Sequence, residues 1–112
     1  MLKVIFHIDE IAKADLTLRN IGNILANLGE DNLKVELLAN SDGVKLFIKP
    51  ATQYVQLLTE LATQGVIFNV CANTLNELGL SKESLLDLTT IVPSGVVELI
   101  KKQEIGYAYI KP

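Results

Sequence analysis

The feature that most constrains the fold is a regular alternation of short apolar runs with helical patterns. Runs rich in β-branched and aromatic residues are typical of buried strands, and they occupy residues 2–8, 33–39, 66–70, 89–92 and 107–110. Between them, apolar residues recur at helical spacing, as in the stripe Leu18, Ile21, Leu25 and Leu28 that ends at Gly29. Strands separated by helices favour right-handed crossovers. The sequence therefore predicts an α/β fold with a mainly parallel sheet and helices on both faces. The direction of the last strand stays open.

Local signals place the ends of several elements. Asp9 is a candidate N-cap for the first helix, and Ser94 is a candidate cap for the last one. On that last helix, Glu98 and Lys102 are spaced to pair on a solvent-exposed face. The run at 44–49 fits either a short helix or a strand. Four glycines follow predicted helices and are expected as C-caps rather than as a phosphate-binding loop: Gly29, Gly65, Gly79 and Gly106.

Composition narrows the class of protein. A chain of 112 residues, 49% hydrophobic and 21% charged, predicts a single domain over residues 1–112 with a sizeable core. The net charge of −3 supplies no basic surface, so neither nucleic acid nor membrane is an expected partner. The N-terminus lacks the pattern of a signal peptide, which predicts a cytoplasmic location. One Cys and one His are too few for a zinc site, so no metal and no cofactor are predicted.

Polar residues gather where the predicted strands end. The carboxyl ends of parallel strands lie on one edge of the sheet, where α/β proteins bind their ligands. Four separate segments should therefore converge on one region around Cys71. Its predicted lining follows these four strands and comprises His7, Asp9, Asn40, Gly43, Asn73, Thr74, Pro93, Ser94 and Gly95.

Cys71 allows two interpretations. It sits between a strand end and a helix start, where backbone N–H groups and the helix dipole favour a thiolate. A reactive thiol is then expected at the mouth of a pocket, with His7 as proton carrier or cationic partner. Ser94 and Gly95 would offer N–H groups to an anion. Free cysteines are also among the most buried residues, and His7 could simply hydrogen-bond Asp9 or a carbonyl. The residues alone leave both interpretations open.

Four motifs add a resemblance. "FHIDE", "CANTL", "VPSGVVEL" and "GYAYIKP" resemble, in this order, the small single-domain members of the DsrE/DsrF-like family of sulfur-relay proteins. The resemblance implies a three-layer α/β/α sandwich with a five-stranded sheet, assembled as homotrimers or hexamers. It also implies that Cys71, at the position of the family's sulfur-accepting cysteine, carries sulfur as a persulfide. The relay proteins often use a second cysteine in a sister subunit, whereas this chain has one.

The functional hypothesis is a sulfur-relay or sulfur-carrier protein, which need not be a true enzyme. Its expected partners are sulfur donor and acceptor proteins and further copies of the chain. The alternatives are a module that binds a small anion without catalysis and a thiol redox sensor. Two contact surfaces are candidates for assembly. One is the C-terminal strand with Tyr107 and Tyr109 on one face. The other is a stripe of Asn20, Asn23 and Asn27 that is otherwise expected to be solvated.

Overall fold

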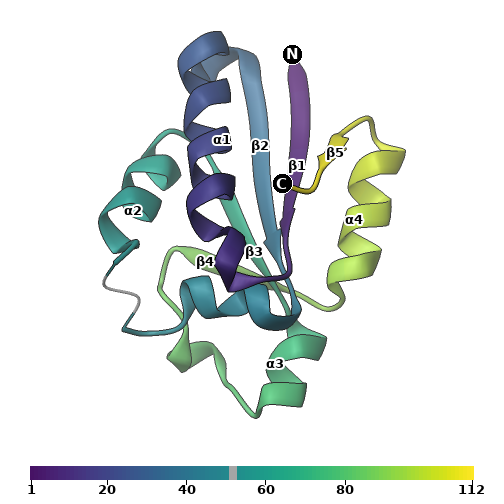
Figure 1. Ribbon diagram of the computed structural model, residues 1–112. Helices are drawn as coiled ribbons and strands as arrows, with labels where there is room; N and C mark the ends of the chain where they lie inside the picture. Colours follow the sequence, from purple (N-terminus) through teal and green to yellow (C-terminus); the bar gives the residue numbers. More distant parts are fainter. Residues whose placement is uncertain (51–52) are drawn as a thin grey trace.

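The protein folds around one parallel sheet (Figure 1). The computed structural model describes residues 1–50 and 53–112. The described strands are β1 (Leu2–Ile8), β2 (Leu33–Ala39), β3 (Ile67–Cys71), β4 (Thr89–Val92) and β5 (Ala108–Ile110), in the order β4-β3-β2-β1-β5. Every pairing between these strands is parallel, and β5 adds to the edge of β1 in register Ile5 with Tyr109. The predicted parallel sheet is confirmed, and the direction of the last strand is now known.

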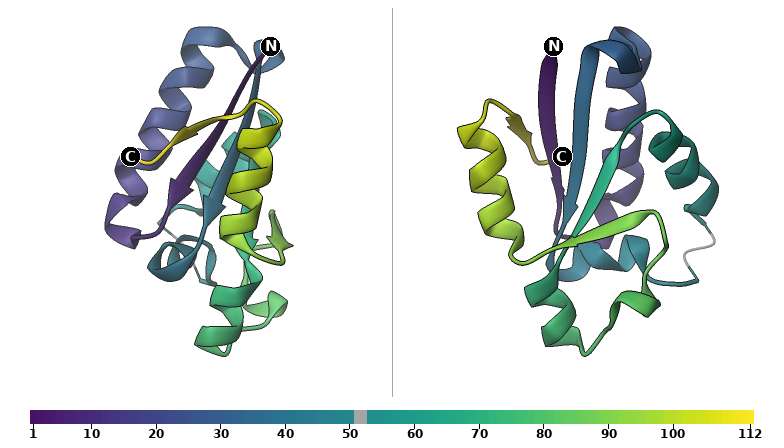
Figure 2. Two further views of the ribbon diagram at one scale, coloured as in Figure 1. Left: turned by 90° about the vertical axis from the view of Figure 1, so that its right-hand side faces the viewer. Right: turned by 180° about the vertical axis from the view of Figure 1, so that it is seen from behind.

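Helices cover both faces of the sheet, as the three views show (Figures 1 and 2). Helices α1 (Ala14–Leu28) and α2 (Val55–Thr63) lie on one face, and α4 (Gly95–Glu104) lies on the other. The short α3 (Ala72–Leu78) lies beyond the carboxyl ends of the strands. Four 3-10 helices complete the described elements: η1 (Ile11–Lys13), η2 (Glu30–Asn32), η3 (Ser41–Phe47) and η4 (Lys82–Ser84). None of the described helices combines the length and the apolar character that crossing a bilayer requires.

The two faces are packed very differently. The face under α1 and α2 holds the large apolar core, in which Phe6, Leu37 and Phe68 are almost fully buried. The face under α4 has a small core in which Leu99 packs on Ile5 and Leu38. Apart from the glycine at its start, Leu99 is the one buried residue of α4. The attachment of α4 to the sheet therefore depends heavily on polar contacts.

The expected N-cap role of Asp9 is wrong. After β1 the chain first forms η1, so α1 begins only at Ala14, and Asp9 lies too far from its first turn to cap it. Asp9 instead pairs with Lys111 at 3.0 Å and ties the C-terminus to the end of β1. The N–H of Ile11, at the start of η1, donates to Asp42 across 2.8 Å. The cap thus comes from a residue 31 positions away, which no local pattern indicates.

Two further expectations are settled by tertiary packing. The run at 44–49 belongs to η3 as far as Phe47, and its apolar side chains Val44 and Phe47 are buried. Glu98 and Lys102 do approach each other, at 3.8 Å, but the expected solvent-exposed face is wrong. Both side chains turn toward the sheet, because a buried carboxylate on β2, Glu36, attracts Lys102.

Candidate functional site

Cys71 lies where three elements meet. It is the last residue of β3, it directly precedes α3, and it touches the first residue of α4. The N–H of Gly95 donates to the Cys71 sulfur across 3.2 Å. Ser94, just before it, caps α4 by accepting from the N–H of Val97 at 3.3 Å, as the sequence predicts. The Cys71 sulfur therefore faces the N-terminal ends of two helices, where partial positive charge accumulates.

The surroundings of the sulfur favour its charged form. Burial is the largest single influence and raises the pKa of the Cys71 thiol. The N–H groups of Thr74, Gly95 and Asn73 and the Thr74 hydroxyl outweigh burial together, so the net pKa is lowered. Among the described residues, the polar groups that act on this sulfur are all donors. A donor-only environment suits a thiolate, which accepts hydrogen bonds but has no proton to give.

The Thr74 hydroxyl is oriented by the start of η3. The N–H of Ser41 donates to the Thr74 hydroxyl oxygen across 2.9 Å. With that oxygen already accepting, the hydroxyl proton remains available for the sulfur. Ser41 adopts a φ of 50°, the left-handed region that a residue with a side chain seldom occupies. Such a backbone persists where surrounding contacts enforce it, often at functional sites.

The sulfur is covered rather than open. Cys71 is only 5% exposed, so the expected accessible thiol at the mouth of a pocket is wrong for the single chain. The start of α4 provides the cover: a methyl group added at Gly95 would lie 3.2 Å from the Cys71 Cβ and 3.5 Å from the Asn40 Cβ. A cavity of about 140 Å³ lies next to this contact, lined by Ser94 and by Val92, the strand partner of Cys71.

His7 is separated from Cys71 by one intervening side chain. Its Nδ1 lies 2.7 Å from the hydroxyl of Tyr109, and its Nε2 lies 2.8 Å from the side-chain oxygen of Asn40. Asn40 in turn borders Gly95, which covers Cys71. The ring nitrogens of His7 therefore pair with neither Asp9 nor a backbone carbonyl, and Asn40 links His7 to Gly95, the residue that covers the sulfur.

The predicted site residues divide into two groups. Those at the sulfur are Asn73, Thr74 and Gly95, with Asn40 bordering Gly95 and with Pro93 and Ser94 lining the adjacent cavity. Gly43 and Asp9 serve the structure instead: Gly43 donates to the Asn40 carbonyl and packs on the backbone of Ile8. Among the described residues, no three His, Cys, Asp or Glu side chains are grouped to hold a metal ion.

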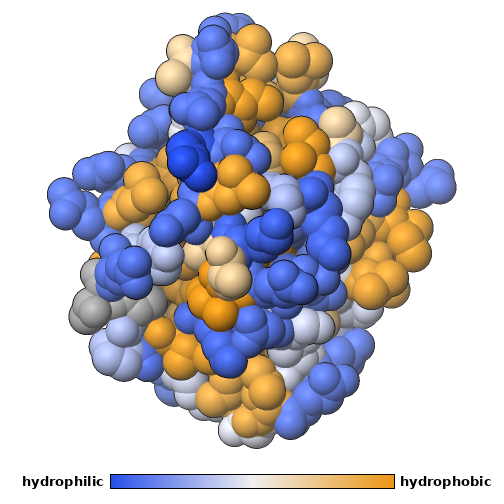
Figure 3. All heavy atoms as spheres, in the orientation of Figure 1, coloured by the Kyte–Doolittle hydropathy of each residue, from blue (hydrophilic) through white to orange (hydrophobic). Residues whose placement is uncertain are grey.

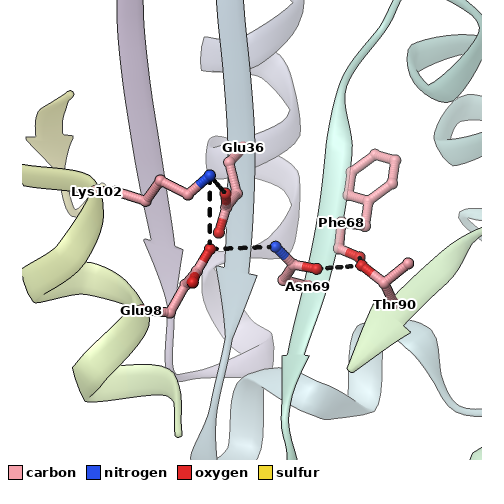
Figure 4. A network of polar contacts seen from close by, with 6 residues as sticks. All are labelled: Glu36, Phe68, Asn69, Thr90, Glu98 and Lys102. Carbon is pink, nitrogen blue, oxygen red and sulfur yellow. Dashed lines mark hydrogen bonds and ion pairs between the residues drawn. The ribbon is translucent and has the colours of Figure 1, made fainter. Parts of the chain in front are cut away.

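A polar network next to the site was not predicted (Figure 4). Glu36 on β2 is 1% exposed, and it lies between Lys102 and Glu98 of α4. Asn69, two residues before Cys71, donates to Glu98 across 3.4 Å and accepts from the Thr90 hydroxyl. The sequence does carry a signal for it: a glutamate inside "LKVELLA", a strand of a sheet buried on both faces, must be buried as well.

The role of Thr74 can be tested by two substitutions. Thr74→Val removes the hydroxyl that donates to the sulfur, and it leaves the Ser41 N–H without an acceptor. We expect the pKa of the Cys71 thiol to rise, and the thiolate fraction at neutral pH to fall by ~threefold or more. Thr74→Ser keeps the hydroxyl and should titrate like the unsubstituted protein. Thiolate absorbance against pH measures both, and equal curves for the two variants would rule out the hydroxyl's role.

Comparison with known proteins agrees with this architecture. The sequence profile of the DsrE/DsrF-like family matches residues 3–112. A protein of unknown function from Methanobacterium thermoautotrophicum, MTH1491, is 35% identical over 100% of both chains, with a TM-score of 0.93. The ychN protein of E. coli is 20% identical over 100% of both chains, and its TM-score of 0.79 shows a shared fold. No curated protein matched the chain. With the profile spanning nearly every residue and the sheet, helices and Cys71 in the order its motifs implied, this chain is a member of the DsrE/DsrF-like family.

Proposed function

We propose that the protein carries sulfane sulfur as a persulfide on Cys71. The observation that carries this proposal is the set of donors around one buried sulfur, in a chain of the DsrE/DsrF-like family, which the motif resemblance connects with sulfur relay. A cysteine that served only as a small apolar side chain would gain nothing from these donors. A sulfur that alternates between thiolate and persulfide uses them in both states, because negative charge returns to it at each transfer.

Loading would proceed by attack of the Cys71 thiolate on the outer sulfur of a donor persulfide. A new S–S bond forms to Cys71, the S–S bond of the donor breaks, and the donor leaves as a thiolate with the electron pair. No oxidant or reductant is consumed, since the transferred sulfur keeps its oxidation state. The lowered pKa of the Cys71 thiol increases the share of attacking thiolate near neutral pH.

Unloading would be the same step in reverse order. An acceptor thiolate attacks the outer sulfur held on Cys71, and Cys71 leaves as a thiolate. Thiols of low pKa leave faster, so the donors from Gly95 and Thr74 assist release as well as loading. A protein that only holds and passes on sulfur in this way is a carrier and needs no turnover of its own.

His7 and Ser94 would support this exchange indirectly. His7 orients Asn40 against the start of α4, and Ser94 holds the first turn of α4 that presents the Gly95 N–H. The adjacent cavity, lined by Ser94 and Val92, would admit the terminal sulfur of a donor. We also place the carrier in the cytoplasm, where a single thiol stays reduced.

We further propose that copies of the chain assemble with closed symmetry, as a trimer or a pair of trimers. The number three comes from the family resemblance. Exposed apolar side chains support the assembly: Val96 and Ile100 of α4 are 59% and 54% exposed, and apolar atoms gather over α4 at the right of Figure 3. A groove of about 420 Å³ between α1 and β5 has Phe6 and Ile110 on its apolar walls and the stripe Asn20, Asn23 and Asn27 at its rim.

A substitution in this groove can test whether the chain assembles through it. Tyr107 packs inside the chain on the core of Ile5 and Leu99, so it is unsuitable, whereas Ile110 is 38% exposed. We expect Ile110→Glu to shift the protein toward monomer in light scattering, because it places a charge in the contact. Leu57→Glu, at a similarly exposed residue of α2, is the control and should leave the assembly intact. A monomeric unsubstituted protein at micromolar concentration would contradict the proposal.

Intact mass after treatment with polysulfide tests the carrier function. We expect the folded protein to gain the mass of sulfur, the gain to vanish with reductant, and the Cys71→Ser variant to gain nothing. No adduct on folded protein would overturn the proposal and favour the anion-binding module. Oxidation of Cys71 by peroxide without any uptake of sulfur would overturn it in favour of the redox sensor.

A further inference from the structure

We propose that Glu36, Glu98 and Lys102 form a proton-dependent clamp that positions α4, and with it the Gly95 N–H, on the Cys71 sulfur. The three are positioning residues, since they act on Cys71 only through the helix. The inference rests on the proposed function only in taking Cys71 as the reactive group.

Polar contacts fasten α4 to the sheet along its whole length. Gly95 donates to Cys71 at the first residue, Glu98 accepts from Asn69 one turn later, and Lys102 reaches Glu36 at 3.2 Å one turn further on. Asn69 and Cys71 lie on the same face of β3, two residues apart. Helix α4 therefore contacts β3 at two points. Because the helix is rigid, a shift at Glu98 also moves Gly95.

The clamp contains more negative than positive charge. Glu36 faces Glu98 and Lys102 from α4, Asn69 from β3, and the apolar Ile5 from β1. Lys102 also lies 5.0 Å from the ring of Tyr107, over which Lys3 lies at 5.9 Å. When Glu36 and Glu98 are both ionised, their two negative charges face the single positive charge of Lys102 in a buried place. With one proton between them, Glu36, Glu98 and Lys102 are neutral as a set.

Burial and the neighbouring carboxyl group hold that proton on the pair. Burial, foremost, and then the neighbouring carboxyl group of Glu98 raise the pKa of Glu36 to about 7. Burial alone would lower the pKa of Lys102, but Glu36 raises it above its usual value, so the lysine stays charged. The contacts among Glu36, Glu98 and Lys102 are therefore favourable while the proton is bound. Loss of the proton leaves an uncompensated negative charge in a buried place.

The direction of the pH effect follows from linkage. An unfolded glutamate releases its proton near pH 4.5, whereas the folded protein keeps the Glu36 proton up to about pH 7. Between these values the folded state binds more protons than the unfolded state, so stability falls as pH rises through this window. Above it the contribution of Glu36 is constant.

The first test measures thermal unfolding against pH. The unsubstituted protein should lose stability between about pH 4.5 and 7. Glu36→Gln has the same shape and cannot ionise, so its curve should lack this decline. The two curves should differ most near pH 7. Parallel curves for the two proteins across this range would overturn the proposal, because the cluster would then bind no proton on folding.

The second test uses two adjacent lysines of α4 and follows thiolate absorbance without any sulfur donor. Lys102→Met removes the cation of the clamp, so we expect α4 to shift and the proton affinity of the Cys71 thiol to rise by ~threefold or more. Lys101→Met removes the same charge from the exposed side of the same helix and should change little. Equal shifts in both variants, or none in Lys102→Met, would overturn the clamp.

Two safeguards keep the result interpretable. Should Lys102→Met fail to fold, Glu36→Gln serves for the same test. Its clamp cannot ionise, so the titration of its Cys71 thiol should be sharper than that of the unsubstituted protein. Equal titrations of these two would then contradict the proposal. Because no sulfur donor is present, a failed titration test leaves persulfide formation untouched, and a failure of sulfur uptake leaves the clamp untouched.

Discussion

Replacing Gly43 with alanine should destabilise the protein severely, although the substitution adds only one methyl group. A Cβ at this position would lie 2.6 Å from the carbonyl carbon of Ile8 and overlap its oxygen. Both groups are backbone, in η3 and at the end of β1, so neither can rotate away. We expect Gly43→Ala to cost ~3 kcal/mol or more and to lower Tm by ~10 °C or more in calorimetry.

A second glycine provides the matched control. Gly22 lies in α1 with no atom within 4 Å of an added Cβ, so Gly22→Ala should be neutral or stabilise by ~0.5–1 kcal/mol. Similar melting temperatures for the two variants would show that β1 and η3 can separate at little cost. The close approach of Ile8 and Gly43, which positions the loop of Asn40 and Ser41, would then be wrong.

The largest effect on chemistry is expected from Gly95→Ala. The new Cβ would lie 3.2 Å from the Cys71 Cβ and 3.4 Å from its sulfur, closer than side-chain carbons normally pack. The Cys71 Cβ is fixed by β3, so the start of α4 moves outward by a few tenths of an ångström, which weakens the hydrogen bond from its N–H to the sulfur. A hydrogen bond to a charged group is worth ~1.5–3 kcal/mol, so weakening it should lower the thiolate fraction at neutral pH by ~threefold to 10-fold.

Sulfur uptake by Gly95→Ala should slow in the same proportion, because the thiolate is the nucleophile. The pH dependence of the uptake rate separates this cause from a blocked entrance. If thiolate supply is limiting, the variant should recover at high pH, where its thiol ionises as well. A rate that stays low at every pH would contradict the role assigned to the Gly95 N–H and would point to obstruction.

The elements of the fold were predictable because their signals are local. β1, β2 and β4 occupy the predicted residues, and α1 ends at Leu28, with Gly29 as its C-cap where the stripe of apolar residues stops. Each of these boundaries depends on residues within one or two turns of it. The third strand runs one residue past its prediction to include Cys71, because its pairing with Val92 on β4 continues to that point.

The site was predictable only in part, because its details depend on distant residues. Parallel topology brought Asn40, Cys71 and Gly95 together as expected. The burial of Cys71 depends on a helix that begins 24 residues later in the chain. The two partners of His7, Asn40 and Tyr109, lie 33 and 102 residues away. No pattern within one segment can indicate such contacts.

The partners in the buried network under α4 could not be predicted either, for a different reason. Glu36 was visible as a charge within an apolar strand, but its partners were not. In the sequence, the spacing of Glu98 and Lys102 fits a pair on the exposed face of the helix as well as a pair that faces the sheet. The ion pair of Lys102 with Glu36 on β2 turns both side chains toward the sheet. The charge of one strand thus decides how a helix far later in the chain is oriented.

The measurement that bears most directly on the carrier is transfer of sulfur from the loaded protein. Cys71 is loaded with polysulfide, excess donor is removed by gel filtration, and intact mass is followed with and without an added thiol acceptor. We predict that the sulfur adduct of the folded protein persists alone and disappears as the acceptor itself gains sulfur. An adduct that forms only after unfolding, or that the acceptor cannot remove, would contradict a sulfur carrier at Cys71.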